Sequence, residues 1–402
     1  MVLGFEQGVL FSKLAPNCIF NRMHRRLKMN RSLQQLHSEL QKEAAREGIP
    51  IFGGFELTAR CNLSCKMCYV KQKGADAKPC EQELTARQWI DLGQAAAGQG
   101  TLTAFLTGGE PLLRADFQEI YDAFCRMGFR LTLFTNGTLI TEEFAKWISK
   151  IPPSTVDITL YGASDHTYFN LCGMKDGFQK AIDGMERLLQ YGVNVRVKTT
   201  IVKTNLQDYK AIKSIAESYH LEFLSNTLIH GNREEGIQKC AELRLSPEEM
   251  YQINLDTLDE YDRSPIDFQK RKDWIKNLPP MSCTAGRCAF FINWEGKLTP
   301  CPLFVAPYTD PLSCGFPEAW RLLREKINEI PAPLKCKTCD KRVFCPVCPP
   351  RLYLETGKFN ETSEYLCLIA KTKEQTATRY QYGNKFGKGD HDHEKSISKA
   401  SH

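Results

Sequence analysis

Residues 51–69 read IFGGFELTARCNLSCKMCY, an apolar run followed at once by three cysteines. The run from Ile51 to Thr58 has the length and residue types of a buried β-strand. Cys61, Cys65 and Cys68 then follow with C-x3-C-x2-C spacing, on the loop that leads from this strand to the next helix. The stretch therefore joins the first strand of a fold to a group of candidate metal ligands.

Further apolar, β-branched runs follow this strand and alternate with amphipathic stretches. A capping box at Thr85 and Gln88 predicts the start of one helix, and Asp116 predicts the start of another. Parallel strands need a helix in each crossover, so six strand–helix units predict a parallel sheet. A closed eight-unit barrel needs about 250 residues, so we expect a partial (β/α)6 barrel with catalysis at the C-terminal ends of its strands. The predicted strands are Ile51–Thr58, Leu102–Thr107, Arg130–Thr135, Thr155–Leu160, Val193–Ile201 and Leu221–Leu228.

The composition is that of a globular protein, with 402 residues, 42% of them hydrophobic and 25% charged. A chain of this length is expected to form at least two cores. Its 53 Lys and Arg exceed its 47 Asp and Glu by only 6, which is too small an excess to indicate a nucleic-acid partner. No apolar stretch approaches the length of a transmembrane helix and the N-terminus lacks a secretory pattern, so we expect a cytoplasmic protein without a membrane partner.

Cysteine is the unusual component, because 17 cysteines occur in a chain with no export signal. In that setting thiols are kept reduced, and metal ligation is the natural alternative to disulfides. Residues 281–370 are rich in Cys, Pro, Gly and Lys and have little apolar mass, so this segment is expected to need metal to hold it. Its eight thiols suffice for two four-cysteine sites, and the spacing alone does not distinguish zinc from iron. These thiols are Cys283, Cys288, Cys301, Cys336, Cys339, Cys345, Cys348 and Cys367.

The N-terminal group has a different character, because no fourth ligand lies close to it. Three thiolates can hold three irons of a four-iron cluster and leave one iron open to an outside molecule. A zinc site would want a nearby fourth Cys or His, and the next histidine along the chain is His166. A structural zinc knuckle is the alternative.

The cysteine spacing, its position after the first strand and the six-unit alternation resemble the radical S-adenosylmethionine (radical SAM) superfamily. The resemblance implies that Cys61, Cys65 and Cys68 form the catalytic centre by holding a [4Fe-4S] cluster. It also implies reductive cleavage of S-adenosylmethionine to a 5'-deoxyadenosyl radical, which removes hydrogen from a substrate. The implied cofactor contacts are Met67 near the adenine, Gly108, Gly109 and Glu110 at the amino group, and Asn136, Thr159 and Arg196 or Lys198 at the ribose and carboxylate.

The C-terminal cysteines resemble the SPASM extension found on many radical SAM enzymes. The resemblance implies two auxiliary [4Fe-4S] clusters and so three clusters in all. Two residues separate Cys345 from Cys348 where the family commonly has three, and Cys314 is left over. The implied ligands are Cys283, Cys288, Cys301 and Cys348 for the first auxiliary cluster, and Cys336, Cys339, Cys345 and Cys367 for the second.

Enzymes with this extension act mostly on peptides, so the resemblance implies a maturase of a ribosomally made peptide that forms a thioether or carbon–carbon crosslink or another side-chain modification. A reducing partner such as flavodoxin or ferredoxin is implied as well. Pro302 follows Cys301 where the sulfatase-activating branch has Asp, which disfavours that branch. Only about 50 residues precede Ile51, too few for an independent leader-binding core. The basic run Arg22–Arg31 suits an acidic leader or RNA, although a solvated helix face is the simpler interpretation.

Two alternatives belong to other classes: a radical enzyme acting on RNA or a small molecule, and a non-catalytic zinc protein. We expect an α/β protein made of a partial barrel followed by a small cluster-bound domain. The expected divisions are an N-terminal extension (1–50), the barrel (51–230), a helical bridge (231–280), the SPASM domain (281–370) and a polar, disordered tail (371–402).

Overall fold

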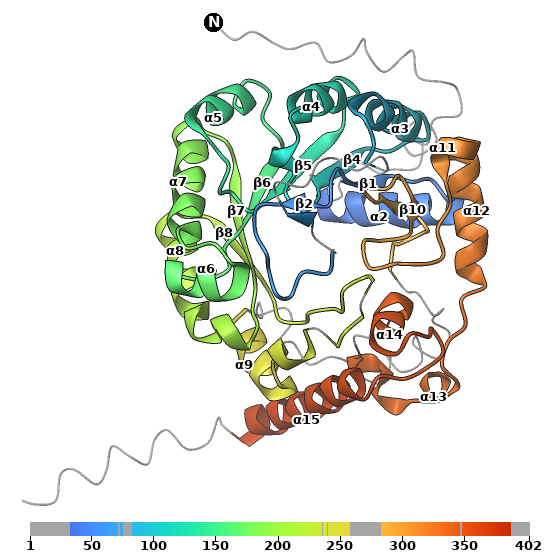
Figure 1. Cartoon of the computed structure of the whole chain (residues 1–402). Coiled ribbons are helices and arrows are strands. Elements are labelled where there is room, and N and C mark those ends of the chain that lie inside the picture. The colour runs from blue at the N-terminus through green and yellow to red at the C-terminus, as the bar shows by residue number, and fades with distance from the viewer. Residues whose placement is uncertain are drawn as a thin grey trace, which may run out of the picture.

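The computed structural model describes residues 33–70, 73–74, 83–234, 236–238, 240–257, 283–345 and 348–386. The basic run at residues 22–31 and the last part of the expected tail, residues 387–402, lie outside this range. A single sheet dominates the molecule, with strands in the order β10-β9-β1-β4-β5-β6-β7-β8. Helices lie along one side of the curved strands (Figure 1).

All six predicted strands are confirmed, each within two residues of its expected ends. They pair in parallel and in chain order, as six consecutive strand–helix units require. The strands are β1 (Phe52–Glu56), β4 (Thr103–Thr107), β5 (Arg130–Thr135), β6 (Thr155–Thr159), β7 (Val195–Thr200) and β8 (Glu222–Asn226). Alternate residues of β4, β5 and β7 are buried, as a half-covered strand requires, whereas β1 and β6 are buried along most of their length.

The helices that cover the sheet start where local capping chemistry predicts. Thr85 and Gln88 form the expected capping box of α3. Helix α4 begins directly after Asp116, but the Asp116 carboxylate pairs with Arg114 at 2.7 Å instead of capping the helix. The elements are α2 (Leu33–Glu47), α3 (Ala86–Gly98), η2 (Pro111–Leu113), α4 (Phe117–Arg126), α5 (Glu142–Ile148), α6 (Asp165–Cys172), α7 (Gly177–Gln190), η3 (Lys203–Asp208) and α8 (Tyr209–Ser218).

The cysteine-rich segment is not a separate unit at its start, contrary to the expected boundary. Strand β9 (Ala289–Ile292) pairs in parallel with β1, and β10 (Leu298–Thr299) pairs antiparallel with β9. Phe290 contacts Phe55 of the barrel edge-on at 5.7 Å, and Phe316 packs behind it at 4.9 Å. The first part of this segment therefore joins the main apolar core, although its sequence has few long apolar runs.

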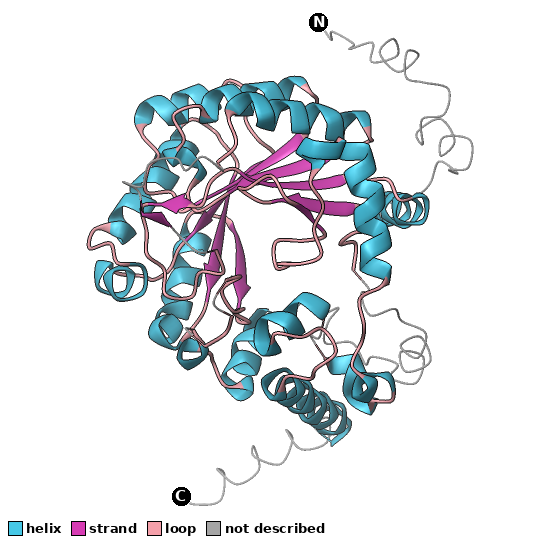
Figure 2. Ribbon diagram, turned by 45° about the vertical axis from the view of Figure 1, so that its right-hand side comes forward, coloured by secondary structure: helices cyan, strands magenta, loops and turns pink. Residues whose placement is uncertain are grey.

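The remaining C-terminal elements pack beside the segment that follows the barrel (Figure 2). Arg244 forms a buried bidentate ion pair with Glu355 of α14. Its guanidinium also lies 4.2 Å from the ring centroid of Tyr365. Helix α15 continues to Phe386, so residues 371–386 are helical and not part of a disordered tail. The elements are η4 (Ala241–Leu243), α9 (Pro247–Thr257), α11 (Pro311–Cys314), α12 (Phe316–Asn328), α13 (Leu334–Lys337), η5 (Asp340–Phe344), α14 (Pro349–Thr356) and α15 (Glu364–Phe386).

Candidate active site

The three N-terminal cysteines lie on one loop at the C-terminal ends of the parallel strands. Cys61 ends the short strand β2 (Arg60–Cys61), which pairs with β3 (Lys73–Gly74). The loop after β4 docks on the start of this loop, because the Gly109 amide donates to the Thr58 carbonyl at 2.7 Å. The position is the one expected for a catalytic centre in a barrel of this type.

The thiols of this group influence one another. Burial raises the pKa of Cys61 far above its ordinary value, and the neighbouring Cys65 and Cys68 raise it further. Burial likewise raises the pKa of Cys68 to about 12, with Cys65 adding to the rise. One buried and two half-buried thiols so close together stay protonated unless a cation offsets the cost of their charge. The donor set therefore fits a positively charged, iron-containing group.

The thiols do not fit a single ion in the same way. Within the described parts of the chain, no three His, Cys, Asp or Glu side chains converge as the ligands of one metal ion would. A four-iron cluster binds each thiolate at a different iron, so its ligands need not converge on one point.

The loop with the sequence Gly-Gly-Glu-Pro supports the cysteine loop directly. A Cβ atom on Gly108 would lie 2.8 Å from the Thr58 carbonyl oxygen, and one on Gly109 would lie 2.3 Å from the Arg60 carbonyl oxygen. Only glycine permits this approach of two backbones. The predicted importance of these glycines thus has a structural basis that is independent of any cofactor.

Glu110 is fully buried and joins the ends of two strands. Its carboxylate accepts hydrogen bonds from the Leu112 amide, the Thr135 hydroxyl and the Asn136 amide, at 2.8–3.0 Å. Burial raises the pKa of Glu110 to about 7, and these hydrogen bonds oppose the rise. The carboxylate expected to meet the amino group of the cofactor is therefore already bound by groups of the chain itself.

Asn136 lies beside the cysteine loop. Its amide nitrogen donates to Asn62 at 2.8 Å and lies 3.9 Å from the Cys61 sulfur. Asn62 in turn donates to the Thr138 hydroxyl at 2.8 Å. Met67 is buried in the apolar cluster that also contains Cys61. Both predicted contact residues are thus brought to the cysteines.

Arg196 and Lys198 lie on the inner face of β7, and both bind one carboxylate. Asp157 of β6 is fully buried. Its carboxylate accepts two hydrogen bonds from Arg196, at 2.8 and 2.9 Å, and forms an ion pair with Lys198. The Lys198 ammonium also lies 3.8 Å from the ring centroid of Phe134. Arg196 also pairs with Glu222 of β8 at 3.5 Å, so two carboxylates face two cations at this point of the inner face.

Thr159, the last residue of β6, is half-buried, and its carbonyl accepts a 3.5 Å hydrogen bond from Tyr168.

A row of aromatic rings crosses the same inner face. Phe105 stacks on Phe134 at 5.0 Å and lies 6.0 Å from Phe291. Gly54 makes room for them, because a Cβ there would lie 2.3 Å from Phe105 and 2.5 Å from Phe291. Sequence reasoning did not single out this row, because its rings come from separate strands.

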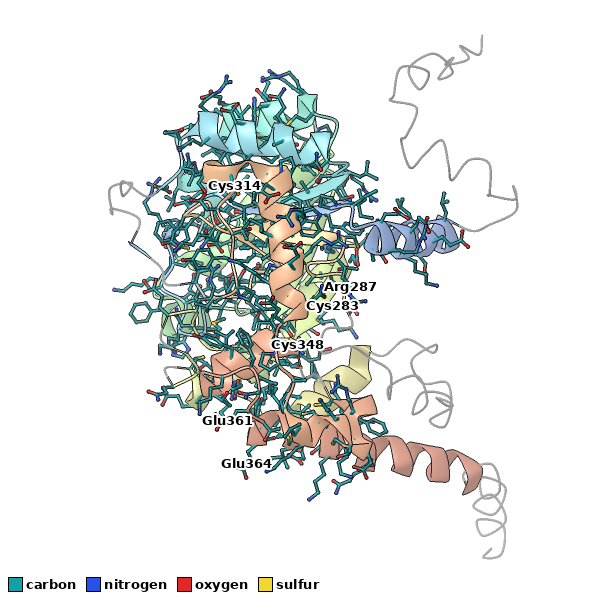
Figure 3. All side chains as sticks on the ribbon, turned by 90° about the vertical axis from the view of Figure 1, so that its right-hand side faces the viewer. Cys283, Arg287, Cys314, Cys348, Glu361 and Glu364 are labelled. Carbon is teal, nitrogen blue, oxygen red and sulfur yellow. The ribbon has the colours of Figure 1, made fainter. Side chains whose placement is uncertain are left out.

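The C-terminal thiols lie in two groups. Burial raises the pKa of Cys301 to about 12, and the thiols of Cys348 and Cys283 add to the rise. Burial also raises the pKa of Cys288 to about 11, and the Cys283 thiol adds to that rise. These are the members expected for the first auxiliary site. Figure 3 shows Cys314 well apart from Cys283 and Cys348.

In the second group, burial raises the pKa of Cys336, and Cys367 and Cys339 add to the rise. Cys345, the fourth expected member, interacts with Lys373 of α15. None of the described cysteines forms a disulfide. Seven of the eight thiols thus interact electrostatically within the two expected groups, whereas their role as cluster ligands stays a prediction.

The comparisons with known proteins agree with this architecture. Residues 55–219 match the model of the radical SAM superfamily. These residues thus form a radical SAM domain, and this family binds S-adenosylmethionine and a [4Fe-4S] cluster. No described helix is long and apolar enough to cross a membrane.

Among curated relatives, the sporulation killing factor maturation protein SkfB of Bacillus subtilis is 30% identical over 63% of this chain, and the match spans 61% of SkfB. An AdoMet-dependent heme synthase of Methanosarcina barkeri is 28% identical over 77% of this chain and 94% of its own length. Streptococcus suis SuiB bound to its precursor peptide SuiA has a similar fold, with a TM-score of 0.62 at 17% identity, over 84% of this chain and 82% of SuiB.

Proposed function

We propose that Cys61, Cys65 and Cys68 hold a [4Fe-4S] cluster at which S-adenosylmethionine binds. When bound, this pair of cofactors supplies the reductive cleavage that gives a 5'-deoxyadenosyl radical. The observation that carries the proposal is the group of three thiols, close enough to influence one another, at the C-terminal strand ends of a radical SAM domain. Three thiolates can hold three irons of a four-iron cluster and leave the fourth iron open.

The neighbouring residues hold and shape this site. Gly108 and Gly109 let the two loops meet, Glu110 locks the second loop to the end of β5, and Asn136 steadies the cysteine loop through Asn62. In this proposal Glu110 acts by fixing the loop that meets the amino group of S-adenosylmethionine. The remaining contacts to the cofactor are proposed for Met67, Thr159, Arg196 and Lys198.

We also propose two auxiliary clusters at the C-terminal thiols. The electrostatic grouping of seven of the eight cysteines supports the two expected sets. With the clusters bound, these thiolates would hold a region that has little apolar mass apart from the part joined to the main core.

The proposed substrate is a ribosomally made peptide, in which hydrogen abstraction leads to a crosslink or another side-chain modification. Two likenesses support it: SkfB is a maturation protein, and SuiB has been solved with a precursor peptide. An external reductant of the flavodoxin or ferredoxin type would deliver electrons.

A second candidate substrate is a tetrapyrrole, which falls within the small-molecule alternative. The heme synthase relative aligns over 94% of its length. The row of Phe291, Phe105 and Phe134 beside Arg196 and Lys198 would suit a flat conjugated molecule that carries carboxylates.

The test of the first step compares wild type with the Cys61→Ala/Cys65→Ala/Cys68→Ala variant after anaerobic reconstitution. We expect the variant to make no 5'-deoxyadenosine while keeping about eight irons on its auxiliary sites. Cys314→Ala is the matched control, because its thiol is exposed and lies apart from both groups, and it should match wild type. Full cofactor cleavage by the triple variant would refute the assignment.

The test of the substrate is anaerobic co-expression with a short peptide encoded beside the gene, followed by intact and fragment mass spectrometry. A loss of two hydrogens localised to a Cys or aromatic side chain supports crosslinking, and one deuterium gained from heavy water supports epimerisation. An unmodified peptide together with decarboxylation of an added iron-tetrapyrrole carboxylate would replace the peptide proposal with the second candidate.

A further inference from the structure

Two side chains outside the cysteine motif contact Cys65. Cys172 is the last residue of α6 and is fully buried, and Tyr161 lies just after β6. The side chains of both hydrogen-bond with the Cys65 thiol. Neither residue was expected at the site, because Cys172 has no partner at metal-ligand spacing and Tyr161 belongs to no motif.

The contact with Cys172 is fixed by the backbone on both sides of Cys65. The Ser64 amide donates to the Cys172 carbonyl at 2.7 Å, and the Lys66 amide donates to the Leu171 carbonyl at 3.0 Å. The C-terminal end of α6 is thus bound to the residues that flank Cys65. These bonds hold the two backbones together, and both side chains pack in the same apolar cluster.

Tyr161 is held just as firmly. Fully buried Asn205 donates to the Tyr161 carbonyl at 2.9 Å and to the Thr200 carbonyl at 3.0 Å, which ties the segment after β6 to the segment after β7. The Tyr161 ring contacts the Tyr168 ring edge-on at 6.1 Å. Tyr161 and Cys65 are packed against the same apolar cluster, which keeps the Tyr161 side chain beside the thiol.

The direction of these hydrogen bonds follows from the state of Cys65. A thiolate that ligates iron carries no proton and only accepts, so the proton between the two sulfurs stays on Cys172. Cys172 S–H and Tyr161 O–H then both donate to one thiolate. Donors to a ligating sulfur stabilise the added negative charge of a reduced cluster and raise its reduction potential.

We propose that Tyr161 and Cys172 are positioning residues that orient Cys65 and raise the reduction potential of the cluster it holds. The inference rests on the proposed function, since it requires a cluster at Cys61, Cys65 and Cys68. It assigns to this chain a pair of donors directed at one of the three ligands only. The cluster is then reduced at a less negative potential than a cluster without these donors.

The experiment is a redox titration of reconstituted protein followed by electron paramagnetic resonance. The titration of the triple cysteine variant is subtracted, which isolates the N-terminal cluster from the auxiliary ones. Cys172→Ala and Tyr161→Phe should each lower the reduction equilibrium constant about tenfold, equivalent to 59 mV for one electron. Cys172→Ser keeps a donor and should restore most of the shift.

Cys240→Ala is the matched control, because Cys240 is a buried thiol of the same apolar cluster whose S–H contacts the His230 carbonyl at 3.4 Å. Its potential should equal that of wild type. Unchanged potentials in both Cys172→Ala and Tyr161→Phe, with full iron content, would overturn the proposal. Loss of N-terminal iron from Cys172→Ala would overturn it too, by making Cys172 a ligand. A wild-type protein without an N-terminal cluster would instead refute the proposed function, so the two failures are distinguishable.

Discussion

The buried ion pair between Glu56 and Arg233 provides a sharp test of how the barrel holds the cysteine loop. Glu56, at the end of β1, is fully buried, and its two oxygens lie 2.6 and 2.7 Å from one Arg233 nitrogen. The Arg233 amide also donates to the Tyr69 carbonyl at 2.9 Å, directly after Cys68. The pair therefore joins the chain after the barrel to both the first strand and the cysteine loop.

Arg233→Met should be strongly destabilising, because it leaves the Glu56 charge buried without a partner. Breaking such a pair costs about 3–5 kcal/mol, whereas replacing both partners by apolar side chains is often near neutral. We expect urea unfolding of the metal-free, reduced protein to show this loss in Arg233→Met. Glu56→Met/Arg233→Met should recover most of it.

Arg46→Met is the control, because the Arg46 side chain is 65% exposed where it pairs with Glu43 and the loss of such a pair should leave the free energy of unfolding almost unchanged. Reconstituted Arg233→Met should also retain less N-terminal iron, since the Tyr69 ring, directly after Cys68, loses the guanidinium that lies 5.5 Å from its centroid. A loss in Arg233→Met no greater than that of the control, or a double variant as unstable as the single one, would show that Glu56 does not depend on Arg233.

Two further predictions concern the loop after β4. Gly109→Ala should cost about 1–3 kcal/mol in thermal or urea unfolding and reduce iron retention, because its Cβ would meet the Arg60 carbonyl at 2.3 Å. Gly98→Ala, at a helical position with open space around the Cβ, should be neutral or slightly stabilising, and equal losses in the two variants would contradict the packing argument. Burial raises the pKa of Glu110 from 4.5 to about 7, so the folded state holds its proton more tightly than the unfolded state. The stabilisation this gives is complete below about pH 4.5 and is lost as the pH rises to about 7, a fall of about 3 kcal/mol that Glu110→Gln should lack. Parallel pH profiles of wild type and Glu110→Gln would refute this.

Much of the fold was predictable because its signals are local. Each strand of the barrel has its own apolar run, and each crossover helix has its own periodicity, as the capping box at Thr85 shows. Asp116 shows the limit of such signals, because an ion pair with Arg114, only two residues away, replaces the expected cap. Residues 281–370 have few long apolar runs, yet Phe290 and Phe316 of this segment join the main core. This is possible because a few aromatic rings bury a large area.

The sequence by itself determined the parallel barrel strands, their order and the loop of Cys61, Cys65 and Cys68, because each depends on residues close together in the chain. Only the tertiary structure decided that β9 extends the sheet beside β1, that Arg233 neutralises Glu56, and that Cys172 and Tyr161 meet Cys65. These contacts join residues that are distant in sequence. No local pattern specifies them, because they arise where separately formed strands and helices pack together.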